Sequence, residues 1–221
     1  MTRKLLAEAL GTMFLLIAVV GSGIMAVRLS AGNDGVALLA NALATGGALI
    51  ALISAFGPIS GAHFNPIVSL FELARGRLPA RLAVSYVPVQ IVSAIAGVFI
   101  AHAMFGLPIV QASTHARDSL GEFIGEIVAT TGLLLTIWGV ARSQPASLPY
   151  AVAAYIVGAY WFTSSTSFAN PAVTIARALT DTFAGIAPAS ILAFVAAQFV
   201  ALTLALVIAW GLRDATNDRG T

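Results

Sequence analysis

The residues best suited to do chemistry in this sequence are two Asn-Pro pairs, Asn65-Pro66 and Asn170-Pro171. Proline is favoured at the first position of a helix, where its missing N–H would have no partner, and asparagine is a favoured cap just before it. Each pair therefore predicts the start of a helix. A helix start carries roughly half a positive charge, and an asparagine amide donates hydrogen bonds. Two such starts facing each other would hold polar, uncharged molecules and repel cations.

The composition predicts that these pairs lie in a membrane protein. Of 221 residues, 59% are hydrophobic and only 9% are charged, whereas an average soluble domain is about 25% charged. The net charge of +2 gives no indication of nucleic-acid binding, and without cysteine the chain has no disulfide or thiolate metal site. Membrane lipid is the partner that the composition implies.

The apolar residues are grouped in blocks, and a bilayer-spanning helix needs roughly 20 of them. Six blocks predict membrane spans, at about 4–27, 36–56, 81–105, 120–142, 149–163 and 186–212. Two further segments, about 65–73 and 170–179, begin at the Asn-Pro pairs and are too short to cross. The Gly-Pro-Ile-Ser-Gly segment 57–61 is expected to break a helix. The predicted fold is therefore an all-α membrane protein with six transmembrane helices and two re-entrant half-helices.

The chain also repeats itself. Two corresponding sets of residues occur in the same order, Glu8, Thr12, Asn65-Pro66 and Gln90, then Glu126, Thr130, Asn170-Pro171 and Gln198. The halves, about 1–112 and 113–221, each hold three spans, so they must insert with opposite orientations. Inverted repeats with broken helices carry their site near the membrane midplane. The predicted protein is one channel domain built from two inverted halves.

The distribution of basic residues predicts the orientation. With the N-terminus inside, the inner side holds Arg3, Lys4, Arg75, Arg77, Arg81, Arg142, Arg213 and Arg219, and the outer side holds Arg28, Arg117 and Arg177. The excess of inner positive charge favours both termini in the cytoplasm.

Two acidic residues, Glu8 and Glu126, fall within predicted spans. An intramembrane carboxylate is costly and is a functional candidate by default. One interpretation is a proton relay, which would make the protein a proton-coupled secondary transporter. The other is a structural role. The residues alone leave both open.

These motifs together resemble the major intrinsic proteins, the aquaporins and aquaglyceroporins. The resemblance rests on Ala7-Glu8-Ala9-Leu10-Gly11-Thr12, on Ser60-Gly61-Ala62-His63-Phe64-Asn65-Pro66-Ile67-Val68 and on Asn170-Pro171-Ala172, and it covers essentially the whole chain. It implies six spans, two half-helices and a homotetramer with one pore per subunit. It also implies that Glu8 and Glu126 accept backbone N–H groups of the loops before the half-helices. Gln90 and Gln198 are expected to bond these loops from neighbouring helices.

The sequence departs from the family pattern at two positions. Ile67 follows the first Asn-Pro pair where the family usually has alanine, and it is expected either to narrow the pore or to repack the half-helix. Val173 stands where the family usually has an arginine at the pore constriction. Spacing from the asparagines places the other constriction residues at Thr45, Gly158 and Ser167. This small, uncharged ring predicts a wide filter and resembles the bacterial branch associated with arsenic resistance.

Three further residues are expected near the pore. Arg177 lies one helical turn beyond Val173, and Glu72 has the matching place seven residues after Asn65. We expect Arg177 at the outer mouth and Glu72 at the inner mouth, with local pairing or capping as the alternative for each. His63 precedes Asn65 by two residues and is expected to contact solute or, alternatively, to sense protons. The remaining histidines, His102 and His115, are interpreted as incidental.

The sequence therefore predicts a passive channel of the inner (plasma) membrane for small uncharged solutes, with no cofactor and no metal. The solutes expected are water, glycerol-like polyols and undissociated metalloid acids such as arsenite. A proton-coupled secondary transporter of a small polar solute is the alternative. An enzyme is disfavoured, because no nucleophile stands near an evident base and no metal-ligand cluster is present.

Overall fold

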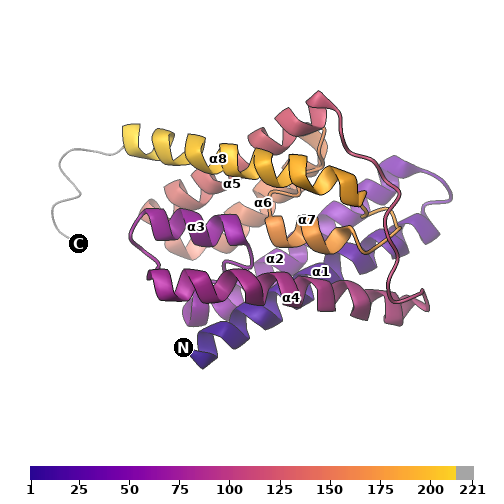
Figure 1. The fold of residues 1–221 in the computed structure, drawn as a ribbon, viewed down its shortest axis with the longest axis horizontal. Helices are drawn as coiled ribbons and strands as arrows, with labels where there is room; N and C mark the ends of the chain where they lie inside the picture. The colour runs from indigo at the N-terminus through magenta and orange to yellow at the C-terminus, as the bar shows by residue number, and fades with distance from the viewer. Residues whose placement is uncertain (213–221) are drawn as a thin grey trace.

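The computed structural model describes residues 1–212 and shows eight α-helices in this part of the chain (Figure 1). They are α1 (Thr2–Leu29), α2 (Asp34–Ser60), α3 (Pro66–Ala74), α4 (Ala80–Phe105), α5 (Leu120–Ser143), α6 (Leu148–Phe162), α7 (Pro171–Arg177) and α8 (Ile191–Gly211). Two 3-10 turns, η1 (Pro145–Ser147) and η2 (Pro188–Ser190), precede α6 and α8. The order of two long helices, a short helix and another long helix occurs twice. Arg213 and Arg219, which enter the orientation argument, lie outside the described residues.

Five of these helical segments are long and apolar enough to cross a membrane: α1, α2, α4, α5 and the run Pro188–Gly211 that joins η2 to α8. The predicted fifth span is α6, which has 15 residues. This is slightly short of the roughly 17 residues that a spanning helix needs. Because η1 leads directly into α6, the helical run begins at Pro145. The predicted fifth span therefore corresponds to these two elements together.

The predicted break at 57–61 is wrong for most of its length. Helix α2 continues through Pro58 to Ser60 and ends at Gly61, whose φ of 93° is the left-handed conformation that favours glycine. A proline this close to a helix end forfeits little of the helix, and the Ser60 hydroxyl donates a hydrogen bond of 2.7 Å to Glu8. The Ser60–Glu8 contact thus stabilises the last turn of α2, which Pro58 and the flanking glycines would disfavour on their own.

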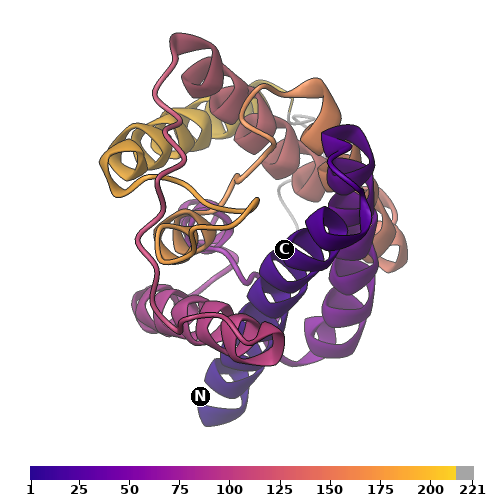
Figure 2. The same ribbon diagram turned by 90° about the vertical axis from the view of Figure 1, so that its right-hand side faces the viewer.

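The half-helices α3 and α7 occupy the middle of the molecule. Figure 1 shows them nearly end to end, and Figure 2 shows them one behind the other beside α4 and α8, against which both pack. The long helices surround them, with α1 against α2 and α4, and α5 against α6 and α8. Large apolar side chains such as Leu43, Val84 and Leu192 are exposed on the outer surface. That surface suits lipid, because lipid tails replace the protein contacts that a soluble core would need.

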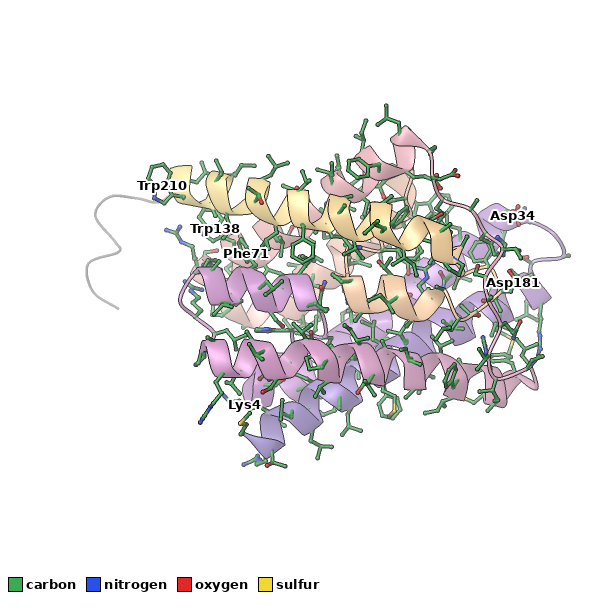
Figure 3. The ribbon with its side chains drawn as sticks, viewed as in Figure 1. Lys4, Asp34, Phe71, Trp138, Asp181 and Trp210 are labelled. Atoms are coloured by element: carbon green, nitrogen blue, oxygen red, sulfur yellow. The ribbon has the colours of Figure 1, made fainter. Side chains whose placement is uncertain are left out.

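The molecule has two ends, which the labelled side chains of Figure 3 mark. Lys4, Trp138 and Trp210 lie toward one end, and Asp34 and Asp181 lie toward the other. We call the first the N-terminal face and the second the far face. Tryptophan gathers at membrane–water boundaries, where its ring is half in apolar surroundings. The two tryptophans are therefore placed where one bilayer surface would lie.

Glycine allows the closest contacts between the elements. A Cβ atom on Gly97 of α4 would lie 2.4 Å from the carbonyl oxygen of Met13 in α1. A Cβ atom on Gly11 of α1 would lie 1.9 Å from the ring of Phe64, in the loop before α3. On α5, a Cβ atom on Gly125 would lie 2.5 Å from Ser164 Oγ. Small residues at these positions let helices and loops approach one another without steric clash.

We expect Gly97→Ala to destabilise the protein, because the added methyl group meets a backbone oxygen that cannot rotate away. Overpacking of this kind costs roughly 1–3 kcal/mol. The measurement is the unfolding temperature of the detergent-solubilised protein. Gly139→Ala in α5 is the matched control, because nothing lies within 4 Å of its Cβ position. Equal unfolding temperatures for the two variants would contradict the close α1–α4 contact.

Candidate functional site

Each half-helix begins at its Asn-Pro pair. Asn65 caps α3 and accepts a hydrogen bond of 2.9 Å from Ile67 N, and Pro66 occupies the first helical position. Asn170 caps α7 in the same way, accepting from Ala172 N at 3.0 Å and from Val173 N at 3.3 Å. The side-chain oxygens are thus used at the helix starts. The amide nitrogens remain available for other contacts.

The amide nitrogens join the two halves. Asn65 Nδ2 donates to the carbonyl of Ala169 at 2.7 Å, and Asn170 Nδ2 donates to the carbonyl of Phe64 at 2.8 Å. Each contact therefore runs from one cap to the residue just before the other cap. An amide nitrogen carries two hydrogens, so each asparagine keeps one N–H beyond this pair of bonds. Both asparagines line the same cavity.

The loops before the two asparagines share an unusual backbone. Ala62 and Phe64, three and one residues before Asn65, have φ of 50°. Ser167 and Ala169, at the same distances before Asn170, have φ of 53° and 47°. Left-handed conformations at non-glycine residues cost about 1–3 kcal/mol each and persist only where the surroundings hold them. Matching strain in both loops indicates that a specific carbonyl arrangement is maintained.

Glu8 holds the first loop. Its carboxylate accepts hydrogen bonds from His63 N at 3.0 Å, from Phe64 N at 2.7 Å and from the Ser60 hydroxyl. The side chain of Gln90 on α4 donates a further bond at 2.9 Å. Four donors therefore meet this fully buried carboxylate, as a polar group away from water requires.

Glu126 holds the second loop in the corresponding manner. Its carboxylate accepts from Phe168 N at 3.2 Å, from Ala169 N at 2.5 Å and from Gln198 Nε2 at 2.7 Å. These are the same loop positions that Glu8 binds. Because N–H donors occupy both carboxylates, the structure favours the structural interpretation of Glu8 and Glu126 over a proton relay.

The two glutamines extend these networks to the half-helices. Gln90 Nε2 also donates to Ser69 Oγ at 3.1 Å, and Gln198 Nε2 also donates to Thr174 Oγ1 at 2.9 Å. Each hydroxyl lies four residues after an asparagine and donates to that asparagine's carbonyl oxygen. Glutamate, loop, half-helix and neighbouring long helix therefore form one hydrogen-bonded unit in each half.

Both asparagines and the loops before them line a cavity of about 260 Å³, which we call the central cavity. Its lining extends from Glu72 and Ala141 toward the N-terminal face, past both asparagines, to Tyr160 and Arg177 toward the far face. Much of the wall is apolar, formed by Leu15, Val19, Leu49, Ile53, Leu133, Ile137, Val152 and Ile156. The cavity therefore combines a polar stripe with a largely apolar wall.

Three of the four expected filter residues, Thr45, Ser167 and Val173, line the central cavity, and Gly158 does not. The residues of α6 that line it are Leu148, Val152, Ile156 and Tyr160. They are four residues apart and so share one helix face, whereas Gly158 lies two residues from the nearest of them and points elsewhere. The count back from Asn170 therefore selected a residue that does not line this cavity. The four-residue spacing within α6 is the signal that could have selected Tyr160 as a lining residue.

The remaining motif residues lie behind the cavity. Ile67 is fully buried in an apolar cluster with Leu134 of α5 and Ala205 of α8, and it is not among the lining residues. It therefore repacks the half-helix and does not narrow the passage. Ala172 is likewise fully buried in the main core.

His63 and Glu72 line the central cavity on the side of the N-terminal face. His63 Nδ1 lies 3.0 Å from Ser69 Oγ, and its ring meets Tyr86 edge-on. Because Ser69 Oγ donates to Asn65, the imidazole nitrogen is the donor in this contact. Glu72 pairs with Arg75 at 2.7 Å. Glu72 thus both lines the cavity and pairs locally.

Arg177 lies deeper than the expected mouth. Its side chain is buried, its Nε donates to the carbonyl of Ala184, and its guanidinium carbon lies 3.5 Å from the centre of the Phe168 ring. It lines the central cavity and also a second cavity of about 490 Å³ that opens on the far face. We call this second space the far-face cavity. It includes Arg117, which sequence reasoning did not select.

The histidines taken as incidental both have partners. His102 is fully buried, with Nδ1 2.8 Å from the carbonyl oxygen of Ile109 and Nε2 2.7 Å from Thr180 Oγ1. His115 lies 3.9 Å from Asp181. Hydrogen bonds from the backbone and hydroxyl of Thr114 lower the pKa of Asp181, so it stays ionised. These contacts tie the loop after α4 to the loop after α7.

Comparison with known proteins agrees with this geometry. The family model described as "Major intrinsic protein" matches residues 1–165. Aquaglyceroporin AqpS of Rhizobium meliloti is 48% identical over 216 residues, 97% of this chain and 92% of the relative. Aquaporin Z of Brucella melitensis is 37% identical over 139 residues, 62% of this chain and 60% of that protein. The X-ray structure of the aquaglyceroporin from Plasmodium falciparum superposes with a TM-score of 0.67 at 18% identity, covering 97% of this chain and 96% of that one.

A helical membrane fold with two opposed half-helices around a cavity defines a channel of the aquaporin type. The chain belongs to the major intrinsic protein family. Members of this family are channels for small neutral solutes and not enzymes.

We expect Glu126→Gln to destabilise the protein by about 2–3 kcal/mol, because one of the two carboxylate oxygens that accept loop N–H groups is replaced by an NH₂ donor. The unfolding temperature in detergent and solute flux in proteoliposomes are the measurements. Glu122→Gln, one turn earlier on α5, is the matched control: Glu122 belongs to an exposed capping box. Its replacement should cost at most about 1 kcal/mol. Unchanged stability with flux that no longer depends on pH would instead support a proton relay.

Proposed function

We propose that this chain is a passive channel for small uncharged solutes: water, glycerol-like polyols and undissociated metalloid acids such as arsenite. The observation that carries the proposal is the reciprocal Asn65–Asn170 arrangement, which lies on a continuous cavity at two half-helix starts. Aquaglyceroporin AqpS of Rhizobium meliloti, a relative over nearly the whole length, supports water and glycerol-like solutes by its name.

Conduction follows from the polar stripe. The second N–H of each asparagine donates to a solute oxygen as it passes the middle of the cavity. Apolar side chains of the same cavity, such as Leu15 and Val19, offer no competing bond. A solute therefore exchanges a few well-placed hydrogen bonds for those it had in water, and it leaves as easily as it enters.

The half-helix starts also oppose cations. Each carries roughly half a positive charge, and both meet at the same place in the cavity. A cation loses hydration there and gains repulsion in return, whereas a neutral molecule meets no such barrier. This arrangement transmits uncharged species along their gradient and needs no coupled ion.

The filter level supports solutes larger than water. Thr45, Ser167 and Val173 bring small, uncharged side chains to the cavity, and the Ser167 hydroxyl is buried without a hydrogen-bond partner among the described residues. A buried, unsatisfied hydroxyl is costly unless a solute or water meets it. We assign Ser167 as a solute contact and Val173 as the position that leaves the passage broad.

The surroundings of the channel are part of the proposal. The excess of basic residues on the side of the termini supports an inner (plasma) membrane location with both termini in the cytoplasm. The far face is then the outer side. A homotetramer with one pore per subunit follows the family pattern.

We expect Val173→Arg to reduce glycerol, urea and arsenite flux several-fold more than water flux, because the guanidinium fills the passage at its broad level. The measurement is stopped-flow swelling of proteoliposomes with each solute. Val173→Leu is the control, because it adds volume without charge and should have a smaller effect.

Two outcomes would contradict the filter assignment: an equal loss for all four solutes, or no loss for any. Flux that saturates and requires a proton gradient in the unsubstituted protein would contradict the channel itself.

A further inference from the structure

Two side chains border both cavities. Among the described residues, only Tyr160 and Arg177 line both the central cavity and the far-face cavity. Tyr160 comes from the last turn of α6, and Arg177 is the last residue of α7. The place where the two cavities adjoin is therefore marked by a phenol and a guanidinium.

Arg177 is a buried cation without a carboxylate partner within residues 1–212. Its side chain is 3% exposed, and its assigned contacts are the Ala184 carbonyl and the ring of Phe168. A buried charge normally needs an opposite charge or abundant hydrogen bonds. A carbonyl and an aromatic face supply part of this stabilisation. The guanidinium also borders both cavities, where a solute could complete its hydrogen bonds.

A second guanidinium reinforces the positive charge at this point. Arg117 lies 5.1 Å from the centre of the same Phe168 ring and also lines the far-face cavity. It is fixed there by hydrogen bonds to the carbonyls of Gly185 at 3.2 Å and Ser165 at 3.4 Å. Two guanidinium groups therefore lie on one ring, and among the described residues Asp34 is the carboxylate that lines the same far-face cavity.

Acceptor groups lie on the same stretch of the passage. The hydroxyls of Tyr160 and Thr45 are 3.4 Å apart, and the unpartnered hydroxyl of Ser167 lines the adjoining central cavity. A guanidinium is a donor only, whereas a hydroxyl both donates and accepts. The combination matches a small molecule with several hydroxyl groups, which needs donors and acceptors within a few ångströms of each other.

We propose that Tyr160 and Arg177 form the selecting constriction of this channel, one helical turn farther toward the far face than position 173. Arg177 supplies the positive barrier to cations and a donor to solute oxygens, and Tyr160 sets the size limit. The solute class this favours is the small neutral polyol or hydroxylated acid. The inference rests on the proposed channel function and places its specificity at residues that spacing from the asparagines does not select.

The charge is tested with Arg177→Met, which keeps length and removes charge, and with Arg177→Lys, which keeps charge. In proteoliposomes we expect potassium leak to rise about tenfold or more in Arg177→Met and to stay low in Arg177→Lys, as one charge in a partly desolvated passage requires. The matched control is Arg28→Met. Arg28 also stacks on a ring and bonds a carbonyl, both of Phe105, but it lines neither cavity.

The size limit is tested with Tyr160→Ala and Val173→Ala. We expect Tyr160→Ala to admit the five-carbon polyol xylitol several-fold faster than the unsubstituted protein does, and Val173→Ala to leave xylitol flux unchanged. The reverse result would place the constriction at position 173 and overturn the proposal. No change in either variant would also overturn it.

The experiments distinguish a failure of the channel function from a failure of the constriction at Tyr160 and Arg177. If the unsubstituted protein conducts neither water nor glycerol, the proposed function fails. If it conducts both, and Arg177→Met leaks no more potassium than Arg28→Met, the placement of the barrier at Arg177 fails. If Arg177→Met does not fold, as judged by size-exclusion chromatography, Tyr160→Ala and Arg177→Lys test the proposed constriction.

Discussion

The rest of this structure depends on one requirement: backbone polar groups inside a bilayer must find partners within the protein. Two loops leave regular helix at the depth of the membrane, and each unpaired N–H there would cost several kcal/mol. Glu8 and Glu126 meet this requirement by accepting two backbone N–H groups apiece, at 2.5–3.2 Å. Two buried carboxylates, costly in themselves, thereby make two irregular segments tolerable.

The other features of the site follow from that support. With their N–H groups bound, the loops keep left-handed conformations at Ala62 and Phe64 and at Ser167 and Ala169. Those conformations present the Phe64 and Ala169 carbonyls to the opposite asparagine. The loops fit only because small residues stand beside them, as Gly11 does against the ring of Phe64. The need to pair the loop N–H groups therefore constrains residues that lie far apart in the sequence.

The sequence was sufficient for the fold, because the Asn-Pro pairs and the repeated glutamates and glutamines carry local and periodic signals. It was insufficient where geometry depends on distant partners. Pro58 suggested a break that the Ser60–Glu8 contact prevents, and a count from Asn170 selected Gly158 although the cavity face of α6 carries Tyr160. His102 and Arg117 were passed over for the same reason: their partners, Thr180 and Phe168, lie 78 and 51 residues away. Such contacts leave no mark on the neighbouring sequence.

The crossed bonds between the two asparagines carry a consequence for biosynthesis. The first four helices leave the ribosome before the second loop exists. At that moment the Asn65 amide lacks its partner, the Ala169 carbonyl, and the Phe64 carbonyl lacks the Asn170 amide. Each half therefore supplies a hydrogen-bond partner that the loop of the other half needs. The crossed bonds at the midpoint can therefore form only after the second loop has been made, and a truncated first half would lack both of them.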